Sequence, residues 1–308
     1  MKYLLLLLLI GEQAFCQKSI DTSMSINVGG IKQYIRLKGK DISKPMLLFL
    51  HGGPGGSLMQ KTDQMTGKLQ QHFVIVQWDQ RETGETLKRN KSPKPLTLQL
   101  FYDDTHEMID TLLTRYNKPK LYLAGYSWGT GMGFYIADKF PGLLYAYIAI
   151  SPVIYQAKSD SISLAILRQW GSKPRKELAN VKIPFENADQ LYYHRKWLYK
   201  YDGQKLVSLI LRRSIVQSWA ATWFDVWTRS CEVNLFESMP SFNCPIYFFA
   251  GGQDLNTNAS ITEQYYKKIS APKKNLFLFE EVGHTLPETN SGRFQDMIIN
   301  KILPETLN

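Results

Sequence analysis

Short apolar runs alternate with helical patterns along most of the chain, and this alternation limits the fold more than any other feature of the sequence. The runs are rich in branched and aromatic residues and occupy residues 32–39, 45–52, 73–79, 120–127, 144–152, 245–254 and 275–284. Apolar residues recur at helical spacing in residues 98–116, 128–140 and 292–303. Apolar strands that alternate with helices indicate a parallel sheet covered on both faces, so the sequence predicts an α/β fold.

One section, from about residue 153 to residue 242, interrupts this alternation. It is rich in Trp, Tyr, Lys and Arg, has the pattern of several helices and lacks apolar strand runs. With 308 residues, 44% of them hydrophobic, the chain is long enough for one large domain with an insertion. We therefore predict a core formed by residues 17–153 and 243–308, with residues 154–242 inserted over the sheet.

The N-terminus, MKYLLLLLLIGEQAFCQKS, is typical of a secretory signal peptide. One lysine precedes an apolar run much shorter than the ~20 residues that span a bilayer, and small residues follow at Ala14 and Cys16. We predict a signal peptide over residues 1–16 and an exported mature chain, periplasmic or secreted, without a transmembrane helix. The alternative is a lipoprotein in which Cys16 is lipidated, although Phe15 is bulky where such sites carry a small residue.

The net charge and the two remaining cysteines leave several alternatives open. The formal net charge is +10, but the basic residues are scattered. Their densest stretches, residues 87–95 and 192–205, are interpreted as a solvated loop and a solvated helix face, so we predict no nucleic-acid partner.

Export allows a disulfide between Cys231 and Cys244, and two free buried thiols are the alternative. No CxxC motif or histidine pair at metal-ligand spacing is present, so we expect no metal and no cofactor.

The segment LYLAGYSWGTGMGF places Ser127 between two glycines where an apolar strand gives way to a helix. A residue in so sharp a turn crowds its neighbours two positions away, which favours Gly125 and Gly129. Ligands of open α/β sheets lie outside the carboxyl ends of the strands, and Ser127 is at such an end. We therefore predict a nucleophilic serine rather than a plain glycine-rich turn.

A serine hydroxyl needs a base to remove its proton, and the base needs an orienting acid. His284 ends the last apolar run and Asp254 ends the preceding one, so both are expected at the same sheet edge as Ser127. We predict that the three form a catalytic triad. Asp254 as a turn or N-cap residue is the alternative, and Glu280 and Glu281 are the rival acids.

The glycine-rich segment HGGPGGS, residues 51–57, follows a buried strand. It lacks the lysine and hydroxyl residue of a phosphate-binding loop. A tetrahedral intermediate needs backbone N–H donors, so we predict an oxyanion hole formed by the N–H of Trp128 and one from Gly52 or Gly53. His51 is expected to hold the loop by hydrogen bonds rather than to do chemistry.

These motifs resemble those of the α/β-hydrolase superfamily. The shared segments are FLHGGPGGS, WDQR, GYSWGT, GGQD and the GH at 283–284, and HGGPG together with GxSWG resembles the proline iminopeptidase-like branch. The resemblance covers the mature chain except the insertion. It implies an eight-stranded, mostly parallel sheet with helices on both faces, and a helical cap at residues 154–242 that forms one wall of the substrate pocket.

The insertion departs from that branch at the residues expected to contact substrate. Prolyl aminopeptidases of the branch carry a cap tryptophan followed by glutamate, and acidic cap residues hold the substrate's amino terminus. In SWAATWFDVWTRSCE no glutamate directly follows a tryptophan. Trp223 is a candidate substrate contact, and Asp225, Glu232 and Glu237 are the candidate carboxylates. Helix core and surface charges are the alternatives for them.

The sequence thus predicts an exported serine hydrolase that forms an acyl-enzyme. We expect an aminopeptidase similar to proline iminopeptidases, acting on short peptides. An esterase or lactonase acting on small acyl esters is the alternative, and a non-catalytic binding module is less favoured because all three triad residues are present. The oligomeric state is left open.

Overall fold

The computed structural model describes residues 18–93, 95–203, 207 and 211–307. The predicted signal peptide at residues 1–16, including Cys16, lies outside the described residues. Within the described part of the chain, no helix combines the length and the apolar character needed to cross a membrane.

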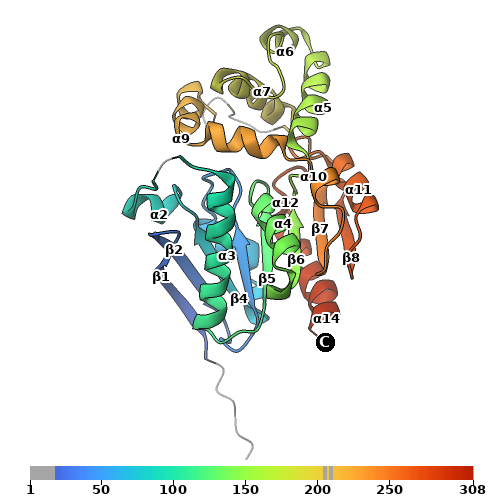
Figure 1. Ribbon diagram of the computed structural model, residues 1–308. Coiled ribbons are helices and arrows are strands. Elements are labelled where there is room, and N and C mark those ends of the chain that lie inside the picture. The colour runs from blue at the N-terminus through green and yellow to red at the C-terminus, as the bar shows by residue number, and fades with distance from the viewer. Residues whose placement is uncertain (1–17, 94, 204–206, 208–210, 308) are drawn as a thin grey trace, which may run out of the picture.

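One eight-stranded sheet forms the centre of the molecule (Figure 1). Its strands are β1 (Ile20–Val28), β2 (Ile31–Gly39), β3 (Met46–Leu50), β4 (Val74–Asp79), β5 (Leu121–Tyr126), β6 (Leu144–Ile150), β7 (Ile246–Gly251) and β8 (Lys274–Phe279). The order is β1-β2-β4-β3-β5-β6-β7-β8, and β2 runs antiparallel to both β1 and β4 while all the other pairs are parallel. The predicted α/β fold with a mostly parallel eight-stranded sheet is confirmed.

Strand β1 is absent from the seven apolar runs that the sequence indicated. Its sequence, IDTSMSINV, alternates polar and apolar residues, and β1 is an edge strand that pairs with β2 alone. Such a strand needs only one apolar face. The turn between β1 and β2 consists of Gly29 and Gly30, both with positive φ (57° and 74°), as a two-residue hairpin of this kind requires.

The strands separate two apolar cores, one on each face of the sheet. Along β3, Met46, Leu48 and Leu50 face one core, whereas Leu47 and Phe49 face the other. The first core is covered by α3 (Leu98–Arg115), α4 (Gly129–Lys139) and α11 (Ala259–Lys268). The second is covered by the short helices α1 (Thr62–Thr66), α12 (Leu286–Thr289) and α13 (Ser291–Met297), by the 3₁₀ helix η2 (Leu69–Gln71) and by the π-helix η4 (Ile298–Ile302).

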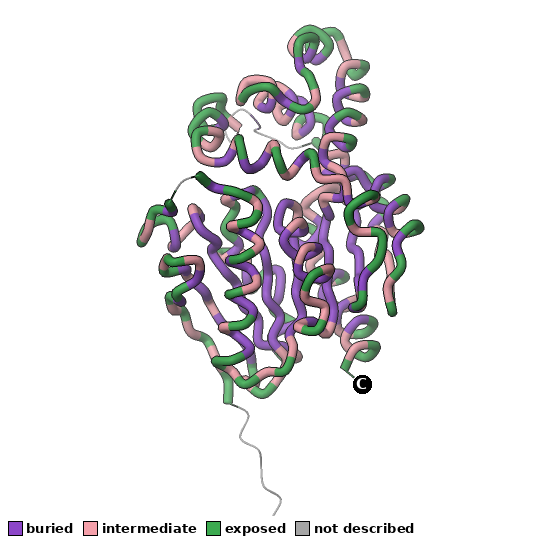
Figure 2. Tube along the Cα trace, viewed as in Figure 1, coloured by how far each residue is buried: buried purple, intermediate pink, exposed green. Residues whose placement is uncertain are grey.

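Short elements complete the periphery of the core. They are η1 (Met59–Lys61), α2 (Gly84–Arg89), η3 (Pro141–Leu143) and, close to the C-terminus, α14 (Leu303–Thr306). Figure 2 shows the strands mostly as buried and the exposed residues on the outer sides of the helices.

A group of helices between β6 and β7 lies over one end of the sheet (Figure 1). We call them the cap helices: α5 (Gln156–Gln169), α6 (Ser172–Glu177), α7 (Ala188–Tyr201), α9 (Arg213–Glu232) and α10 (Leu235–Ser238). They lie at the end where the parallel strands finish, which is the edge at which open α/β sheets bind their ligands.

The two cysteines in the described part of the chain are free and buried. Cys231 is in α9, and Cys244 lies two residues before β7. Of the two alternatives left open by the sequence, the structure shows free thiols rather than a disulfide.

Candidate active site

Ser127 occupies the sharp turn between β5 and α4. Its φ is 52°, a left-handed conformation that residues other than glycine adopt rarely. A Cβ on Gly125 would lie 2.8 Å from the carbonyl oxygen of Gly129, and a Cβ on Gly129 would lie 2.7 Å from that of His51. The turn therefore requires a glycine two positions on either side of the serine, which explains the G-x-S-x-G spacing.

A chain of hydrogen bonds links Ser127 to His284 and Asp254. The Nε2 atom of His284 lies 3.0 Å from Ser127 Oγ, and its Nδ1 atom lies 2.8 Å from Asp254 Oδ2. A carboxylate only accepts hydrogen bonds, so Nδ1 carries the proton and Nε2 is free to accept one from the serine. The structure thus brings together the three residues that the sequence selected, from the ends of β5, β7 and β8.

The surroundings of Asp254 hold its carboxylate in one orientation. The side chain is buried and accepts hydrogen bonds from the backbone N–H groups of Asn256 and Thr257 and from the Thr257 hydroxyl. The rival acids Glu280 and Glu281 are exposed on the loop that follows β8. This geometry favours Asp254 as the partner of the histidine.

Two hydroxyl groups that the sequence did not single out fix the backbone of the histidine. Ser151 Oγ donates to the carbonyl oxygen of His284 over 2.9 Å, and the hydroxyl of Tyr126 donates to the same oxygen over 3.3 Å. Ser151 directly follows β6 and shares the positive φ of Ser127, at 44°. A polar residue at the carboxyl end of a strand was the available signal for it.

The loop HGGPG lies directly against Ser127. A Cβ on Gly52 would be 3.0 Å from Ser127 Cβ, and Gly53 lines the same cavity as the serine. Trp128, at the start of α4, lines it too. The three residues predicted for an oxyanion hole therefore lie around Ser127, and their role as donors stays a prediction.

His51 holds this loop through both ring nitrogens. The backbone N–H of Gln80 donates to Nε2 over 3.2 Å, so Nδ1 carries the proton and donates to the carbonyl oxygen of Gly52 over 2.9 Å. Burial lowers the pKa of His51, which favours this neutral form. The expected structural role of His51 is confirmed.

Two tryptophans of α9 contact the same loop from the cap. The indole N–H of Trp219 donates to the carbonyl oxygen of Pro54 over 3.0 Å. A Cβ on Gly55 would lie 3.0 Å from Trp223 Nε1, and the Trp223 ring packs near Phe101 and Trp128. Trp223 thus packs between cap and core, while Trp219 lines the cavity described next.

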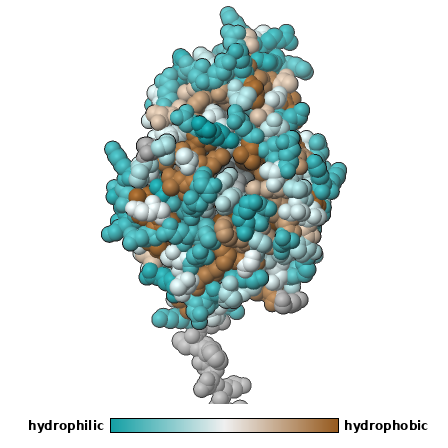
Figure 3. Space-filling view, in the orientation of Figure 1, coloured by the Kyte–Doolittle hydropathy of each residue, from teal (hydrophilic) through white to brown (hydrophobic). Residues whose placement is uncertain are grey.

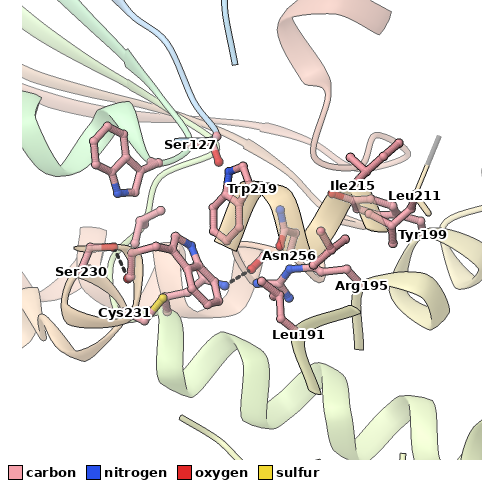
Figure 4. Close-up of a pocket in the computed structure, with 16 residues that line it drawn as sticks. Ser127, Leu191, Arg195, Tyr199, Leu211, Ile215, Trp219, Ser230, Cys231 and Asn256 are labelled. Carbon is pink, nitrogen blue, oxygen red and sulfur yellow. Dashed lines mark hydrogen bonds between the residues drawn. The ribbon is translucent and has the colours of Figure 1, made fainter. Parts of the chain in front are cut away.

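A cavity of about 270 Å³ separates Ser127 from the cap helices (Figure 4). Most of its lining is aliphatic or aromatic, and its volume is close to the lower end of the roughly 300–1,000 Å³ typical of small-molecule sites. Figure 3 shows apolar residues gathered where the cap helices meet the core. The lining residues include Gly53, Ser127, Trp128, Gln156, Leu191, Arg195, Tyr199, Val216, Trp219, Trp227, Cys231 and Asn256.

A family model described as serine aminopeptidase, S33, matches residues 41–289 of this chain. The chain belongs to this family. It is similar to the probable aminopeptidase YbaC of Bacillus subtilis (strain 168), with 29% identity over 293 residues, which cover 87% of this chain and 92% of that protein. It also resembles the proline iminopeptidase of Lactobacillus helveticus (strain DPC 4571), with 30% identity over 115 residues, or 36% of this chain and 37% of that protein.

Solved structures agree on the fold. The crystal structure of the proline iminopeptidase of Mycobacterium smegmatis has 15% sequence identity and a TM-score of 0.67, and the match covers 93% of this chain and 99% of that chain. The S33 family match, the aminopeptidase relative and this likeness confirm the resemblance to the α/β-hydrolase superfamily, and the chain is an enzyme of the α/β-hydrolase type.

For an S33 aminopeptidase, the carboxylates expected to face the nucleophile are not where the sequence suggested. Asp225, Glu232 and Glu237 are all exposed, and none of them lines the cavity. The cavity-facing residues of α9 recur at helical spacing, and Asp225 lies two positions before Trp227, which turns it about 200° away. The structure therefore contradicts these three assignments, and it does not place Trp223 in the cavity lining either.

The basic stretch interpreted as a solvated helix face contains two buried groups instead. His194 is fully buried, and the side chain of Arg195 is only 11% exposed and lines the cavity. Arg195 Nη1 donates to Asp160 Oδ1 over 2.7 Å and to His194 Nδ1 over 2.9 Å. Burial, assisted by the charge of Arg195, holds the pKa of His194 well below its usual value, so this histidine is neutral.

One carboxylate that the sequence did not single out is electrostatically coupled to the triad. Asp202 follows α7, and loss of surrounding water together with the negative charge of Asp254 raises its pKa from 3.8 to about 6. The charge of His284 acts on it in the opposite direction. Asp202 is an exposed residue and does not line the cavity, so its link to the triad is an electrostatic one and not a contact.

Proposed function

We propose that this enzyme is an exported serine aminopeptidase, similar to proline iminopeptidases, that cleaves short peptides through an acyl-enzyme. The observation that carries the proposal is the hydrogen-bonded series Ser127–His284–Asp254 beside a cavity, in a chain of the S33 family. The base is within hydrogen-bond distance of both the nucleophile and the orienting acid, as this chemistry requires.

In the proposed reaction, Ser127 Oγ attacks the carbonyl carbon of the first peptide bond while His284 Nε2 takes the hydroxyl proton. Backbone N–H groups of Trp128 and of Gly52 or Gly53 stabilise the oxyanion, each by roughly 3–4 kcal/mol. The histidine then gives its proton to the leaving amine, and the amino-acyl group stays on Ser127. Water attacks this ester by the same route, with His284 again acting as base.

Asp202 is our proposed partner for the protonated amine of the substrate. A cation that leaves water for a pocket is costly to bury without an opposite charge. The charge of Asp202 is coupled to both Asp254 and His284, and a pKa of about 6 leaves it ionised at pH 7. It is exposed, as Asp225, Glu232 and Glu237 are, and we choose it because its charge interacts with those of Asp254 and His284.

One observation favours a second candidate, an esterase or lactonase for small acyl esters. None of the described residues that line the cavity carries a carboxylate. A neutral acyl group needs no such partner, and the same triad cleaves esters and amides. The two candidates differ in whether a free amino group improves the substrate.

A parallel hydrolysis panel separates them. Aminoacyl arylamides, including prolyl arylamide, are compared with their N-acetyl forms and with short acyl esters, and Ser127→Ala serves as the blank. We expect the free amine to raise kcat/KM, and Asp202→Asn to remove that advantage while leaving neutral esters unchanged. Hydrolysis of esters alone would favour the esterase, and no difference between Ser127→Ala and wild type would overturn both.

We also propose that the chain is exported after cleavage behind Cys16, on the strength of its N-terminal sequence. The mass of the mature protein tests this: an N-terminus at Gln17 is expected. A diacylglyceryl-modified Cys16 would mean lipoprotein anchoring instead, and an intact N-terminus in the cytoplasmic fraction would contradict export.

A further inference from the structure

Arg195 is the single charged side chain among the described residues that line the cavity, and it faces a nucleophile across mostly apolar walls (Figure 4). We propose that Arg195 binds a carboxylate at the far end of the substrate's acyl group, so that the enzyme prefers acyl groups with an acidic side chain. This inference deepens the proposed hydrolase function and rests on it for the identity of the scissile bond.

The guanidinium makes its hydrogen bonds through one nitrogen only. Nη1 makes both of its hydrogen bonds, to Asp160 and to His194, and within the described part of the chain Nε and Nη2 have no hydrogen-bond partner. Arginine presents its N–H groups as a rigid fork that matches a carboxylate. The side chain therefore has donors left for a ligand in the cavity.

Residues that contact Asp160 and His194 hold these two partners of the arginine in place. Gln156 Nε2 bridges Asp160 Oδ1 and the carbonyl oxygen of Asn256, and His194 Nε2 lies 3.1 Å from Ser163 Oγ. Because Nδ1 of His194 accepts from Arg195, its Nε2 carries the proton and donates to the serine. The guanidinium also lies over the ring of Trp227, 5.8 Å from the centroid. These contacts order the arginine before substrate binds.

The position of the cavity relative to the triad assigns the acyl side. In a triad mechanism the leaving group departs next to the histidine that protonates it. The described cavity lining includes Ser127, Gly53 and Trp128 but not His284. The substrate portion that fills the cavity and approaches Arg195 is therefore the acyl group, and a volume of about 270 Å³ suits a short one.

A purely structural role is the competing explanation, because Arg195 joins α5 to α7 through Asp160. The Asp160–Arg195 pair is also neutral overall, which weakens the long-range attraction of an anion. The two roles differ in a measurable way. A structural clamp affects all substrates alike, whereas a recognition residue affects those with the carboxylate.

Two matched substrate pairs test the proposal. The first is L-glutamyl against L-glutaminyl α-4-nitroanilide, which differ only in side-chain charge. The second is the 4-nitrophenyl monoester of adipic acid against its methyl-capped ester, which needs no amino group. Because charge-assisted hydrogen bonds exceed neutral ones by roughly 1 kcal/mol, we expect a preference of roughly five- to tenfold in kcat/KM for the anionic member of each pair that is hydrolysed.

Three variants test whether the preference for the anionic substrate depends on Arg195. Arg195→Gln is expected to bring the ratio close to one, whereas Asp160→Asn, which keeps the guanidinium, should preserve or increase it. Lys200→Gln removes a positive charge from the exposed side of the same helix and should leave the ratio unchanged. If Arg195→Gln does not fold by circular dichroism, Arg195→Lys replaces it and should retain part of the preference.

A binding measurement on an inactive variant tests the role of Arg195 independently of the proposed hydrolysis. Calorimetry with Ser127→Ala compares monomethyl adipate with dimethyl adipate, and tighter binding of the monoanion that disappears in the Ser127→Ala/Arg195→Gln variant is expected. That result without hydrolysis of any substrate would support the anion site and reject the hydrolase. Equal binding of the two esters, or equal losses on all substrates in Arg195→Gln and Asp160→Asn, would overturn the role of Arg195.

Discussion

The indole N–H of Trp219 donates a hydrogen bond of 3.0 Å to the carbonyl oxygen of Pro54, which joins α9 of the cap to the glycine-rich loop beside Ser127. Gly53, in the same loop, is one of the proposed oxyanion donors. This hydrogen bond is therefore one of the contacts that link the position of the cap to the position of the donors.

Trp219→Phe tests this link, because it keeps the ring packing and removes the N–H. We expect kcat to fall several-fold, since donors that move by a fraction of an ångström stabilise the oxyanion less well. The control is Trp170→Phe on the outer part of the cap, where the side chain is exposed. Steady-state kinetics on one ester suffice, and equal kcat values for both variants would mean that this hydrogen bond does not position the loop.

Asp254→Asn should lower kcat by roughly 10⁴-fold, as the loss of the orienting acid does in serine proteases. The amide donates where the carboxylate accepted, so it favours the wrong tautomer of His284. Glu281→Gln is the matched control because Glu281 is an exposed acid on the same loop as the histidine. If the control were crippling and Asp254→Asn mild, Glu281 would be the acid of the triad.

Two glycines of α4 should respond in opposite directions to alanine. A Cβ on Gly129 would contact the carbonyl oxygens of Leu50 and His51, whereas a Cβ on Gly131 would meet nothing within 4 Å. Gly129→Ala is therefore expected to disrupt the serine turn and lower both Tm and activity. Gly131→Ala should stabilise the fold by about 0.5–1 kcal/mol through helix propensity. Thermal melts of both variants test this prediction. Equal Tm values would contradict the crowding of the turn at Gly129.

The pH dependence of amine binding should follow Asp202. Its pKa is raised to about 6, so the side chain is neutral below that pH and negative above it. We expect KM for substrates with a free amine to increase as the pH falls through about 6, and KM for neutral esters to stay level there. In Asp202→Asn the difference should vanish, and its persistence would assign the amine to another group.

The triad could be located from the sequence because the topology of a parallel sheet determines where the ends of its strands lie. Once Ser127, Asp254 and His284 are assigned to the ends of parallel strands, the sheet brings all three to one edge, whatever the lengths of the connections between them. Gly125 and Gly129 gave a second indication of the site, because backbone atoms lie too close to either position for a residue with a Cβ atom.

The cap could not be oriented in the same way. Its helices carry aromatic residues around much of their circumference, so periodicity did not tell which side faces the cavity, and Asp225 was placed inside when it is exposed. Arg195 was missed for a related reason: it stands in a basic stretch that resembles a solvated helix face, and its partner Asp160 comes from a different helix. Strand β1 escaped notice because an edge strand needs apolar residues on one face only.

Labelling with a fluorophosphonate, followed by mass spectrometry, tests the central claim most directly, because this reagent forms a stable adduct with an activated serine. The account predicts a single adduct on the peptide that contains Ser127, loss of hydrolysis in proportion to labelling, and neither adduct nor turnover in Ser127→Ala with an unchanged circular dichroism spectrum. An adduct on a different residue, or activity of Ser127→Ala within tenfold of wild type, would contradict the triad.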